Sequence, residues 1–454
     1  MINYIQNKKN GIRIIPFGGL GEIGKNMMAI EVDKEIFIID CGIGFPGQQV
    51  TDIDFYIPDF SYLVENVERI KAILVTHGHE DHIGAIPYLI KNMGLPIYAS
   101  SLTNGLIRVK LKEHGLAAET ELNDIEPGVP IKIGNVEIEF FRVCHSIPDA
   151  MGISIKTPLG KIIHTGDFKI DHTPVDGKPT NFQAMSTVAG EGVLLLCSDS
   201  TYSENEGYTP SEFIIEEAFN KVIGEAKGRI IVATFASLIS RMQQVIDIAA
   251  RYDRKVTIAG KSMINNVKMA KKMGYLNIPD DMLIPLDEAT KIKDRRIVIL
   301  ATGAQGEPSS ALTRIANSDH KHLKIKKGDT IIVSASPIPG NEKAISKTID
   351  NLFRQGADVF YNKNSQVHVH GHASREELKL MISLFKPKYF MPIHGEYRHL
   401  VAHARLARRM GVDKDNAFVI EDGDVLFLTN ESGEVVGNIG TELVSVKGNK
   451  ISSH

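Results

Sequence analysis

The chain has 454 residues, of which 43% are hydrophobic and 24% charged, with a formal net charge of −3 and three cysteines. This length exceeds one compact core and predicts two or three globular domains, and no apolar run reaches the roughly 18 residues of a membrane span. The near-neutral charge gives no general support for nucleic-acid binding, and three widely spaced cysteines argue against a disulfide framework and favour a cytoplasmic protein.

The first half of the chain is rich in short apolar stretches. Residues 11–40 alternate such stretches with glycine-rich turns, which is typical of a β-meander. Further strands are predicted over 72–76, 136–141, 152–157, 161–164 and 193–197, and helices over 83–92 and 101–114. This mixture predicts an α/β or α+β protein with a layered core.

The pattern changes near residue 208. Thr209-Pro210-Ser211-Glu212 has the form of a capping box with proline at the first helical position, which predicts a helix start. Strands over 229–234, 255–259, 296–301, 330–335 and 357–360 then alternate with helices over 238–251, 262–273 and 341–354. This is the rhythm of an open parallel sheet, so we expect residues 208–361 to form a separate domain.

The last part of the chain returns to a mixed pattern. We predict a strand over 366–369, a helix over 374–385, a strand over 388–393, a helix over 397–410 and a hairpin over 416–428. If residues 362–454 complete the domain begun by residues 1–207, the segment 208–361 is an insertion in that domain.

A dense group of polar residues follows the strand at 72–76. It is His77-Gly78-His79-Glu80-Asp81-His82, with three imidazoles and two carboxylates in six positions. Imidazole nitrogen and carboxylate oxygen are the ligands that Zn²⁺ takes at ~2.0–2.2 Å. Because the segment joins a buried strand to a helix, it lies where α/β proteins place their chemistry, and we predict a metal site there.

Three more candidate ligands each lie just past an apolar strand. They are His145, Asp167 and His394. Taken singly, each is typical of a turn or cap residue. Together with the cluster at 77–82 they form a complete set of ligands for two metal ions at one sheet edge.

The His-x-His-x-Asp-His pattern resembles the metallo-β-lactamase superfamily. This resemblance implies an αββα sandwich and two Zn²⁺ ions per chain, with Mn²⁺ as an alternative because nitrogen and oxygen ligands accept several metals. By the same resemblance the first ion takes His77, His79 and His145, the second takes Asp81, His82 and His394, and Asp167 bridges them. Asp40 matches the superfamily's first motif and is expected to orient a ligand without binding metal itself.

The inserted segment resembles the β-CASP domain of nucleases in this superfamily. Asp199 and His372 match its marker residues on either side of the insertion, and His394 matches a third. More narrowly, residues 17–26, 76–84, 233–237 and 336–342 resemble bacterial ribonuclease J. Members of that family usually carry a further C-terminal domain, which we expect this chain to lack.

The resemblance implies a metal-dependent ribonuclease that degrades RNA from the 5′ end and can also act as an endonuclease. Asp81 is a candidate to take a proton from the nucleophile, and His372 is the candidate acid or charge stabiliser at the leaving group. Asp199 would hold the tautomer of His372. Open alternatives are a small-molecule hydrolase for lactams or thioesters, a non-catalytic RNA-binding protein and a DNA-directed nuclease.

Two turns that lead into helices are candidate phosphate cradles. Ser374 and Glu377 form a predicted capping box just after Gly371-His372-Ala373, and Ser336 to Gly340 precede the helix at 341–354. His370 and Ser237 can add donors. By resemblance to ribonuclease J, Ser237, Ser336 and residues 370–374 would bind the 5′-monophosphate of RNA; ordinary helix caps are the alternative.

The expected partners are RNA and further copies of this chain, as a homodimer or higher homo-oligomer, with no membrane. Two basic groups are candidate contacts for the RNA backbone: Lys321, Lys324, Lys326 and Lys327, and Arg405, Arg408 and Arg409. Either group is also typical of a solvated surface.

Overall fold

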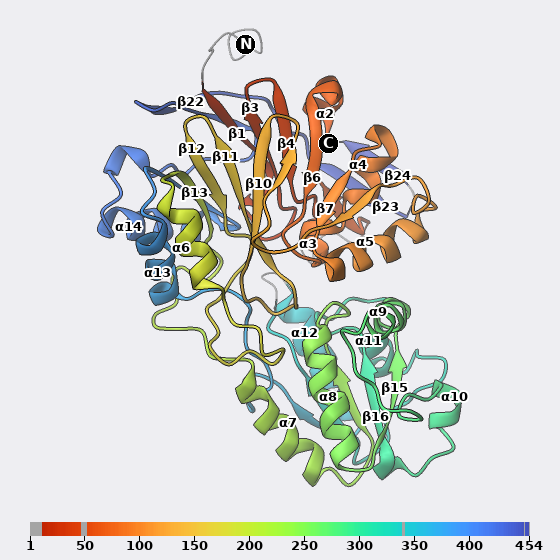
Figure 1. Cartoon of the computed structure of the whole chain (residues 1–454). Helices are drawn as coiled ribbons and strands as arrows, with labels where there is room; N and C mark the ends of the chain where they lie inside the picture. The colour runs from red at the N-terminus through yellow and green to blue at the C-terminus, as the bar shows by residue number, and fades with distance from the viewer. Residues whose placement is uncertain (1–10, 47–51, 338–340, 449, 454) are drawn as a thin grey trace.

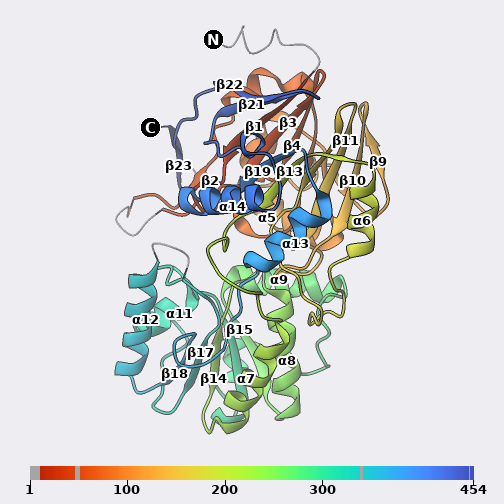
Figure 2. The same cartoon turned by 90° about the vertical axis from the view of Figure 1, so that its left-hand side faces the viewer.

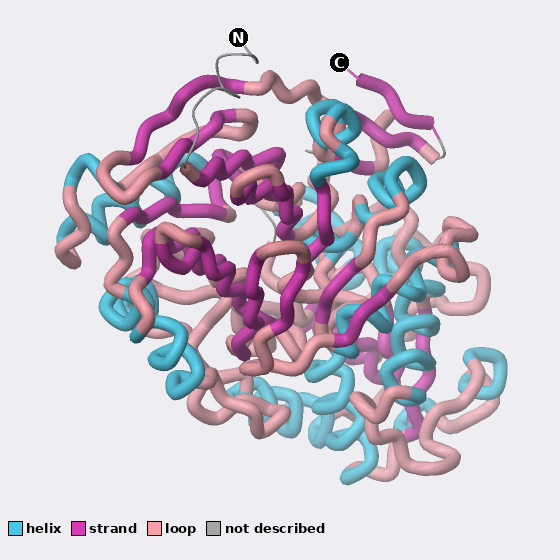
Figure 3. The backbone as a smooth tube through the Cα atoms, turned by 45° about the horizontal axis from the view of Figure 1, so that its top comes forward, coloured by secondary structure: helices cyan, strands magenta, loops and turns pink. Residues whose placement is uncertain are grey.

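The computed structural model describes residues 11–46, 52–337, 341–448 and 450–453. Two large sheets pack face to face with helices on both outer sides, and a third sheet with its own helices lies beneath them (Figure 1). Most strands lie in the middle of the molecule with helices around them, whereas the strands beside the C-terminus lie at its edge (Figure 3). This layering confirms the expected α/β class, the sandwich and a further, parallel sheet.

The first sheet has eight strands, in the order β22, β21, β1, β3, β4, β6, β7, β8. The predicted meander is confirmed, because β1, β3 and β4 pair antiparallel through short connections. The strand bounds are β1 (Ile12–Gly18), β3 (Met27–Val32), β4 (Glu35–Ile39), β6 (Ile70–Leu74), β7 (Ile97–Ala99), β8 (Leu122–Asp124), β21 (Asp424–Leu428) and β22 (Gly433–Asn438). Its outer face packs on α2 (Ser61–Glu65), α3 (Glu80–Ile83), α4 (Ile86–Met93) and α5 (Ser101–Glu113).

The second sheet has six strands, in the order β19, β13, β12, β11, β10, β9. The bounds are β9 (Ile131–Ile133), β10 (Val136–Arg142), β11 (Met151–Thr157), β12 (Gly160–His164), β13 (Val193–Asp199) and β19 (Tyr389–Ile393). β19 pairs in parallel with β13. Segments that precede and follow the third sheet in the sequence therefore share one layer. Three helices cover the outer face: α6 (Phe182–Gly190), α13 (Arg375–Phe385) and α14 (Tyr397–Arg409).

The two sheets are held together by apolar side chains that alternate along their strands. Ile14 and Ile30 of the first sheet meet Ile138 and Ile153 of the second in one cluster, and all four are 0% exposed. Full burial of each such side chain stabilises the fold by about 1.5–3 kcal/mol. The sandwich is therefore a rigid base for the loops at its ends.

The third sheet is wholly parallel, in the order β15, β16, β14, β17, β18. Its strands are β14 (Ile230–Ala233), β15 (Lys255–Ala259), β16 (Ile297–Ala301), β17 (Thr330–Val333) and β18 (Asp358–Phe360), and its helices are α7 (Phe213–Glu225), α8 (Ile239–Arg251), α9 (Lys261–Lys272), α10 (Leu286–Ala289), α11 (Ala311–Ala316) and α12 (Glu342–Arg354). α7 and α8 lie on one side of the sheet and α11 and α12 on the other (Figure 2). The alternation predicted over 229–360 is confirmed, whereas the domain limits at 208 and 361 stay a prediction.

The prediction that a helix starts at Pro210 is wrong, because α7 begins only at Phe213. The residues that look like a capping box make other contacts. Thr209 Oγ1 donates to the carbonyl oxygen of His372 at 2.7 Å, and the Glu212 carboxylate binds the Arg241 guanidinium. The polar side chains therefore join this connection to distant segments and do not cap the helix.

Two predictions near the C-terminus are also wrong. Residues 366–369 form no strand; the carbonyl oxygen of Val367 instead accepts from Arg241 at 3.2 Å and from Ser334 Oγ at 2.7 Å. The hairpin lies at 424–438 and not at 416–428, because the reversal occurs where Thr429 Oγ1 accepts from Ser432 N at 3.0 Å.

Small elements complete the fold: β2 (Leu20–Gly21) with β20 (Gly395–Glu396), and β5 (Phe55–Ile57) with β23 (Val444–Lys447) and β24 (Lys450–Ser453). Residues 338–340 of the predicted turn before α12 lie outside the described residues. Within the described chain, no helix combines the length and apolar content needed to cross a bilayer.

Candidate metal centre and active-site cleft

The predicted ligands all lie in loops that follow strands of the two facing sheets. Residues 77–82 follow β6, His145 follows β10, Asp167 follows β12 and His394 follows β19. His77, His82, Asp167 and His394 are at most 3% exposed. The structure thus brings all seven predicted ligands together, although they span more than 300 positions of the chain.

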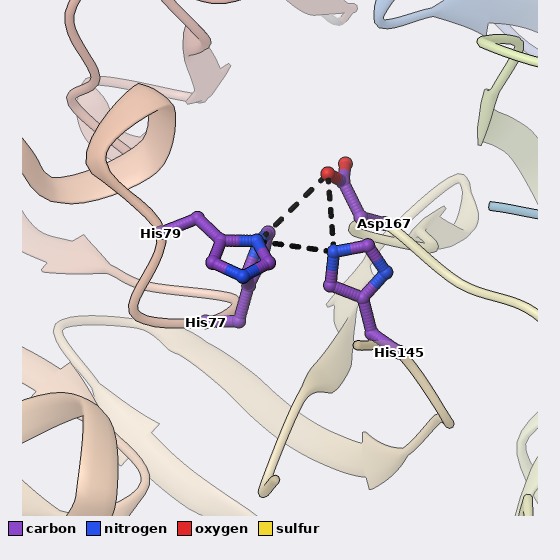
Figure 4. A group of neighbouring side chains, drawn as sticks. All are labelled: His77, His79, His145 and Asp167. Carbon is purple, nitrogen blue, oxygen red and sulfur yellow. Dashed lines mark hydrogen bonds and ion pairs between the residues drawn. The ribbon is translucent and has the colours of Figure 1, made fainter. Parts of the chain in front are cut away.

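The first group of possible metal ligands is His77, His79, His145 and Asp167 (Figure 4). His79 Nδ1 lies 3.0 Å from His77 Nε2 and 3.1 Å from His145 Nε2. Asp167 Oδ2 lies 3.7 and 3.8 Å from the same two Nε2 atoms. A tetrahedral ion with bonds of ~2.0–2.1 Å needs ligand atoms roughly 3.3–3.4 Å apart. These four atoms are therefore spaced to hold one cation.

The second group is Asp81, His82, Asp167 and His394. His82 Nε2 lies 3.2 Å from Asp167 Oδ2 and 3.6 Å from Asp81 Oδ2. His394 Nε2 is 3.3 Å from Asp81 Oδ2, and its Nδ1 is 3.4 Å from Asp167 Oδ1. Asp167 belongs to both groups, so its carboxylate lies between two possible cation positions.

The ring nitrogens that face away from the ligand groups have their own partners. His145 Nδ1 donates to the carbonyl oxygen of Gly371 at 2.7 Å, and His82 Nδ1 lies 2.8 Å from Asp40 Oδ2. His77 Nδ1 is 3.0 Å from Thr76 Oγ1, whose hydroxyl donates to Asp40 Oδ2 at 2.8 Å. These contacts leave each Nε2 lone pair directed at the centre of its group, as metal-binding histidines require. Asp40 lies where the sequence places it, beside the ligands.

Burial sets the protonation of the first group. It lowers the pKa of His79 to about 4 and that of His77 and His145 well below the usual value, because the charged ring would lose its water. Burial has the opposite effect on Asp167, but the cationic rings of His394 and His82 outweigh it and keep its pKa low. Neutral imidazoles around an ionised carboxylate are the protonation states that bind metal.

The second group holds protons of its own. Burial opposes a charge on His394, but Asp167 and Asp199 outweigh it and raise its pKa to about 10. The pKa of His82 is also raised well above its usual value, against burial, with Asp167 the strongest cause. A cation bound there would replace these protons.

His372 and Asp199 form a pair beside the second group. His372 Nδ1 is 2.8 Å from Asp199 Oδ2 and 3.9 Å from Asp167 Oδ2. Burial disfavours its charge, but Asp199 reverses the effect and raises the pKa of His372. Asp199 therefore favours the protonated ring, whose Nε2–H is the proton that the side chain can donate.

A cleft of about 610 Å³ opens from the ligands toward the third sheet. Its walls include Ser237 and Ser336 at the carboxyl ends of third-sheet strands, and His370, Gly371 and His372 on the facing side. Ser336 Oγ accepts from Asn362 Nδ2 at 2.8 Å, which leaves its own O–H free to donate. The cleft is large enough for a nucleotide-sized ligand.

Two residues predicted for the phosphate pocket do not line this cleft. Ala373 and Ser374 are 1% and 3% exposed. The predicted capping box of Ser374 and Glu377 is confirmed, and the next N–H groups of α13 donate to carbonyl oxygens: Arg375 N to Asn205 at 2.9 Å and Glu376 N to Gly207 at 3.1 Å. Since these donors are already bonded, the start of α13 offers little to an anion.

His370 is predicted from the sequence to donate a hydrogen bond to the phosphate, and the structure shows how its ring is held. Its Nδ1 donates to the carbonyl oxygen of His372 at 3.0 Å, and its ring stacks on Tyr202 with centroids 3.7 Å apart. Burial lowers its pKa to about 4, so the ring is neutral near pH 7. In that state Nε2 accepts hydrogen bonds and does not donate them.

The basic groups proposed for RNA lie away from the cleft walls. Residues 320–327 precede β17, whose opposite, carboxyl end leads to Ser336, and Lys326 pairs with Asp294 at 2.7 Å. On α14, Arg408 donates to the carbonyl oxygens of Lys414 and Ala417. Among the described residues, the basic side chains on the cleft wall are Lys110 and Arg398.

Sequence reasoning missed three polar residues that contact the predicted ligands. Asn26 Nδ2 is 3.3 Å from Asp81 Oδ2 and 3.1 Å from His82 Nε2. Thr201 Oγ1 is 2.7 Å from His394 Nδ1, and Thr76 bridges Asp40 and His77 as described. Two of them could have been found from the sequence, because Thr76 and Thr201 lie within two positions of motif residues.

Three family models match the chain. They are "Ribonuclease J, beta-CASP domain" over residues 227–352, "Beta-lactamase superfamily domain" over 36–186 and "Zn-dependent metallo-hydrolase RNA specificity domain" over 362–419. A solved structure, "Crystal Structure of a Protein of Unknown Function from Enterococcus faecalis V583", matches 92% of this chain and 100% of its own with a TM-score of 0.63 at 15% identity. At that identity it supports the fold alone.

Curated relatives match nearly the whole chain. "Ribonuclease J 1" of Streptococcus pyogenes serotype M3 is 45% identical over 98% of this chain and 80% of its own length. "Ribonuclease J" of Synechocystis is 44% identical over 96% and 69%, and that of Thermus thermophilus is 45% identical over 96% and 77%. The chain therefore belongs to the ribonuclease J family, with a metallo-β-lactamase domain that carries a β-CASP domain and a His/Asp cluster able to bind metal.

Proposed function

We propose that the protein hydrolyses RNA phosphodiester bonds with two divalent metal ions. One ion would be held by His77, His79 and His145 and the other by Asp81, His82 and His394, with Asp167 shared between them. The observation that carries this proposal is the convergence of both ligand groups on Asp167, with neighbouring ligand atoms 3.0–3.8 Å apart. Small-molecule hydrolysis is disfavoured, because the relatives are named as ribonucleases and the cleft is shared with the inserted domain.

The residues fit such ions in both donor type and spacing. Nitrogen and carboxylate donors suit Zn²⁺ and also admit Mn²⁺. Bound ions would supply a nucleophile at neutral pH from water and positive charge against the phosphate oxygens. Asp40 would keep the ring of His82 oriented through the 2.8 Å contact at Nδ1.

His372 is our candidate for the acid at the leaving oxygen. Asp199 raises its pKa and so favours the protonated ring, and the 2.8 Å contact at Nδ1 leaves Nε2–H to face the substrate. General acid catalysis of this kind contributes roughly 10²–10⁴-fold. Asp81 remains a candidate base, although the positive rings beside it lower its pKa despite burial and make it a weak one.

The part of the cleft lined by Ser237, Ser336 and Gly371 is our candidate for the 5′-monophosphate site. The supporting donors are the hydroxyls of Ser237 and Ser336 and the backbone near Gly371, all on its walls. A phosphate held there, in the same cleft as the metal ligands, would align the first phosphodiester bond for removal of single nucleotides from the 5′ end. Ala373 and Ser374 are not part of this proposal because they do not line the cleft.

The proposal is tested with RNAs that differ only at the 5′ end. We expect the metal-loaded protein to degrade 5′-monophosphorylated RNA at least tenfold faster than RNA with a 5′-hydroxyl or triphosphate, and His82→Ala to abolish cleavage while the fold is kept. A circular RNA of the same sequence separates internal cleavage from end-dependent cleavage. Equal rates on all linear RNAs would remove the 5′-phosphate site, and full activity of His82→Ala would remove the metal mechanism.

Two further proposals concern the protein as a whole. The homo-oligomer expected from the family resemblance is tested by light scattering of the eluting protein, where a monomer mass at all concentrations would contradict it. A cytoplasmic location is supported by the three free, buried cysteines and is tested by cell fractionation.

A further inference from the structure

Glu377 is a fully buried carboxylate, 0% exposed, that the proposed chemistry does not use. Its oxygens accept from three backbone N–H groups: Oε1 from Ile170 at 2.7 Å, and Oε2 from Thr209 at 2.7 Å and from Ser374 at 2.8 Å. Capping of α13 needs only the bond from Ser374. The other two bonds therefore serve something besides the helix start.

The three donors belong to separate segments, each close to the site. Ile170 lies three positions after Asp167, and Ser374 lies two positions after His372. Thr209 lies in the connection to the third sheet, and its Oγ1 donates to the carbonyl oxygen of His372 at 2.7 Å. One side chain thus joins the loop of Asp167, the loop of His372 and the connection between the domains.

This arrangement matters because Asp167 and His372 are 205 positions apart and their loops come from opposite sides of the inserted segment. His372 Nδ1 lies 3.9 Å from Asp167 Oδ2. Asp199 holds the ring of His372 directly, at 2.8 Å, whereas the bonds at Glu377 fix the backbone of both loops to one helix. Hydrogen bonds to a buried charged group are among the stronger ones in proteins, so such a hub resists displacement.

We infer that Glu377 is a positioning residue, which holds His372 at its working distance from Asp167 and locks both loops to the entry of the inserted domain. The inference rests on the role proposed above for His372 as the acid at the leaving oxygen. Misplacement of such a group by about 1 Å costs on the order of 10²-fold in rate. RNA binding depends on the cleft walls and should change little.

The test variant is Glu377→Gln, which keeps the shape but turns one acceptor into an NH₂ group facing an N–H. Its matched control is Glu376→Gln, because the neighbouring carboxylate is partly exposed and pairs with Lys379 Nζ at 2.7 Å. Two substrates are compared in the metal-loaded protein: 5′-monophosphorylated RNA, whose leaving oxygen needs a proton, and bis(p-nitrophenyl) phosphate, whose p-nitrophenolate does not.

For Glu377→Gln we expect kcat on RNA to fall about 10- to 100-fold, with KM and the rate on bis(p-nitrophenyl) phosphate changed less than about threefold. Metal content and melting temperature should match those of the control. An equal loss on both substrates, loss of metal, or no loss on RNA would each overturn the inference, because a merely structural residue would not separate the two leaving groups.

If Glu377→Gln does not fold, Glu377→Asp provides the same test. It keeps the charge but shortens the side chain by one methylene, so its oxygens cannot reach all three N–H groups, and we expect a roughly three- to tenfold loss on RNA alone; no loss, or an equal loss on both substrates, overturns the inference. His372→Ala separates the two proposals. Full RNA cleavage by that variant would reject the role of His372, whereas its loss together with undiminished cleavage by Glu377→Gln and Glu377→Asp would reject only the role of Glu377.

Discussion

Replacing Gly371 by alanine probes how closely the loop of His372 packs on the first ligand group. A Cβ at this position would lie 2.6 Å from both Cε1 and Nδ1 of His145 and 2.9 Å from the backbone nitrogen of Ser146. Ordinary contacts begin near 3.4 Å, so the ring or the loop must move by about 0.8 Å. The 2.7 Å bond from His145 Nδ1 to the Gly371 carbonyl oxygen would be strained by the same movement.

The expected loss of metal affinity in Gly371→Ala follows from the narrow range of metal–ligand bond lengths. Bond lengths to a metal ion vary by only about ±0.2 Å, so a shift of His145 Nε2 by several tenths of an ångström takes it out of bonding range. Loss of the hydrogen bond that orients a ligand costs roughly 10- to 100-fold in metal affinity. We expect Gly371→Ala to bind metal about 10- to 100-fold more weakly and to lose about 100-fold in kcat/KM on RNA.

The assay is a competition titration with a zinc chelator, followed by RNA cleavage at saturating metal. Gly190→Ala is the control, because a Cβ there meets nothing within 4 Å. Wild-type metal affinity and activity in Gly371→Ala would refute the reasoning, since they would show that the loop and the ligand group are not in tight contact.

Three more predictions concern protons and ligand orientation. Burial, and then Glu22, raise the pKa of Asp422 to about 8 from its usual 3.8, so the free energy of unfolding should fall as the pH rises from about 4 to 8, because the folded state binds this proton more tightly. Asp422→Asn should flatten that slope in denaturant titrations, and an unchanged slope would contradict the assignment. Despite burial, surrounding carboxylates raise the pKa of His82 and of His394, the latter to about 10. Metal uptake at pH 7 should therefore release two or more protons, measured by calorimetry in buffers of different ionisation enthalpy; release of none would be inconsistent with these protonation states. Thr201→Val should weaken metal binding roughly tenfold in a competition titration, because it removes the 2.7 Å partner of His394 Nδ1, and an unchanged affinity would argue against that role.

The metal ligands could be predicted because their signals are local. His77 to His82 are contiguous, and His145, Asp167 and His394 each follow an apolar strand whose end can be read from the sequence. Strands that run parallel in one sheet bring their following loops to one edge, which places His145, Asp167 and His394 together after β10, β12 and β19. The cluster at 77–82 follows β6 of the first sheet, so its place opposite them depends on how the two sheets pack. Most strands and helices were predictable for the same reason.

Contacts between distant segments could not be predicted. Thr209 and Glu212 have the spacing of a helix cap, but the partner of Glu212 is Arg241, 29 positions later, and only the folded chain reveals it. Asn26 meets Asp81 across 55 positions, and Thr201 meets His394 across 193. Single polar residues of this kind carry no periodic signal, so sequence reasoning had no means to select them.

The account depends most on two cations that share the carboxylate of Asp167. Anomalous X-ray diffraction from crystals of the metal-loaded protein, collected on both sides of the zinc or manganese absorption edge, locates such ions directly. We predict two anomalous peaks per chain, one among His77, His79 and His145 and one among Asp81, His82 and His394, each within bonding distance of Asp167. A single peak, or peaks away from these side chains in a protein that cleaves RNA, would contradict the account.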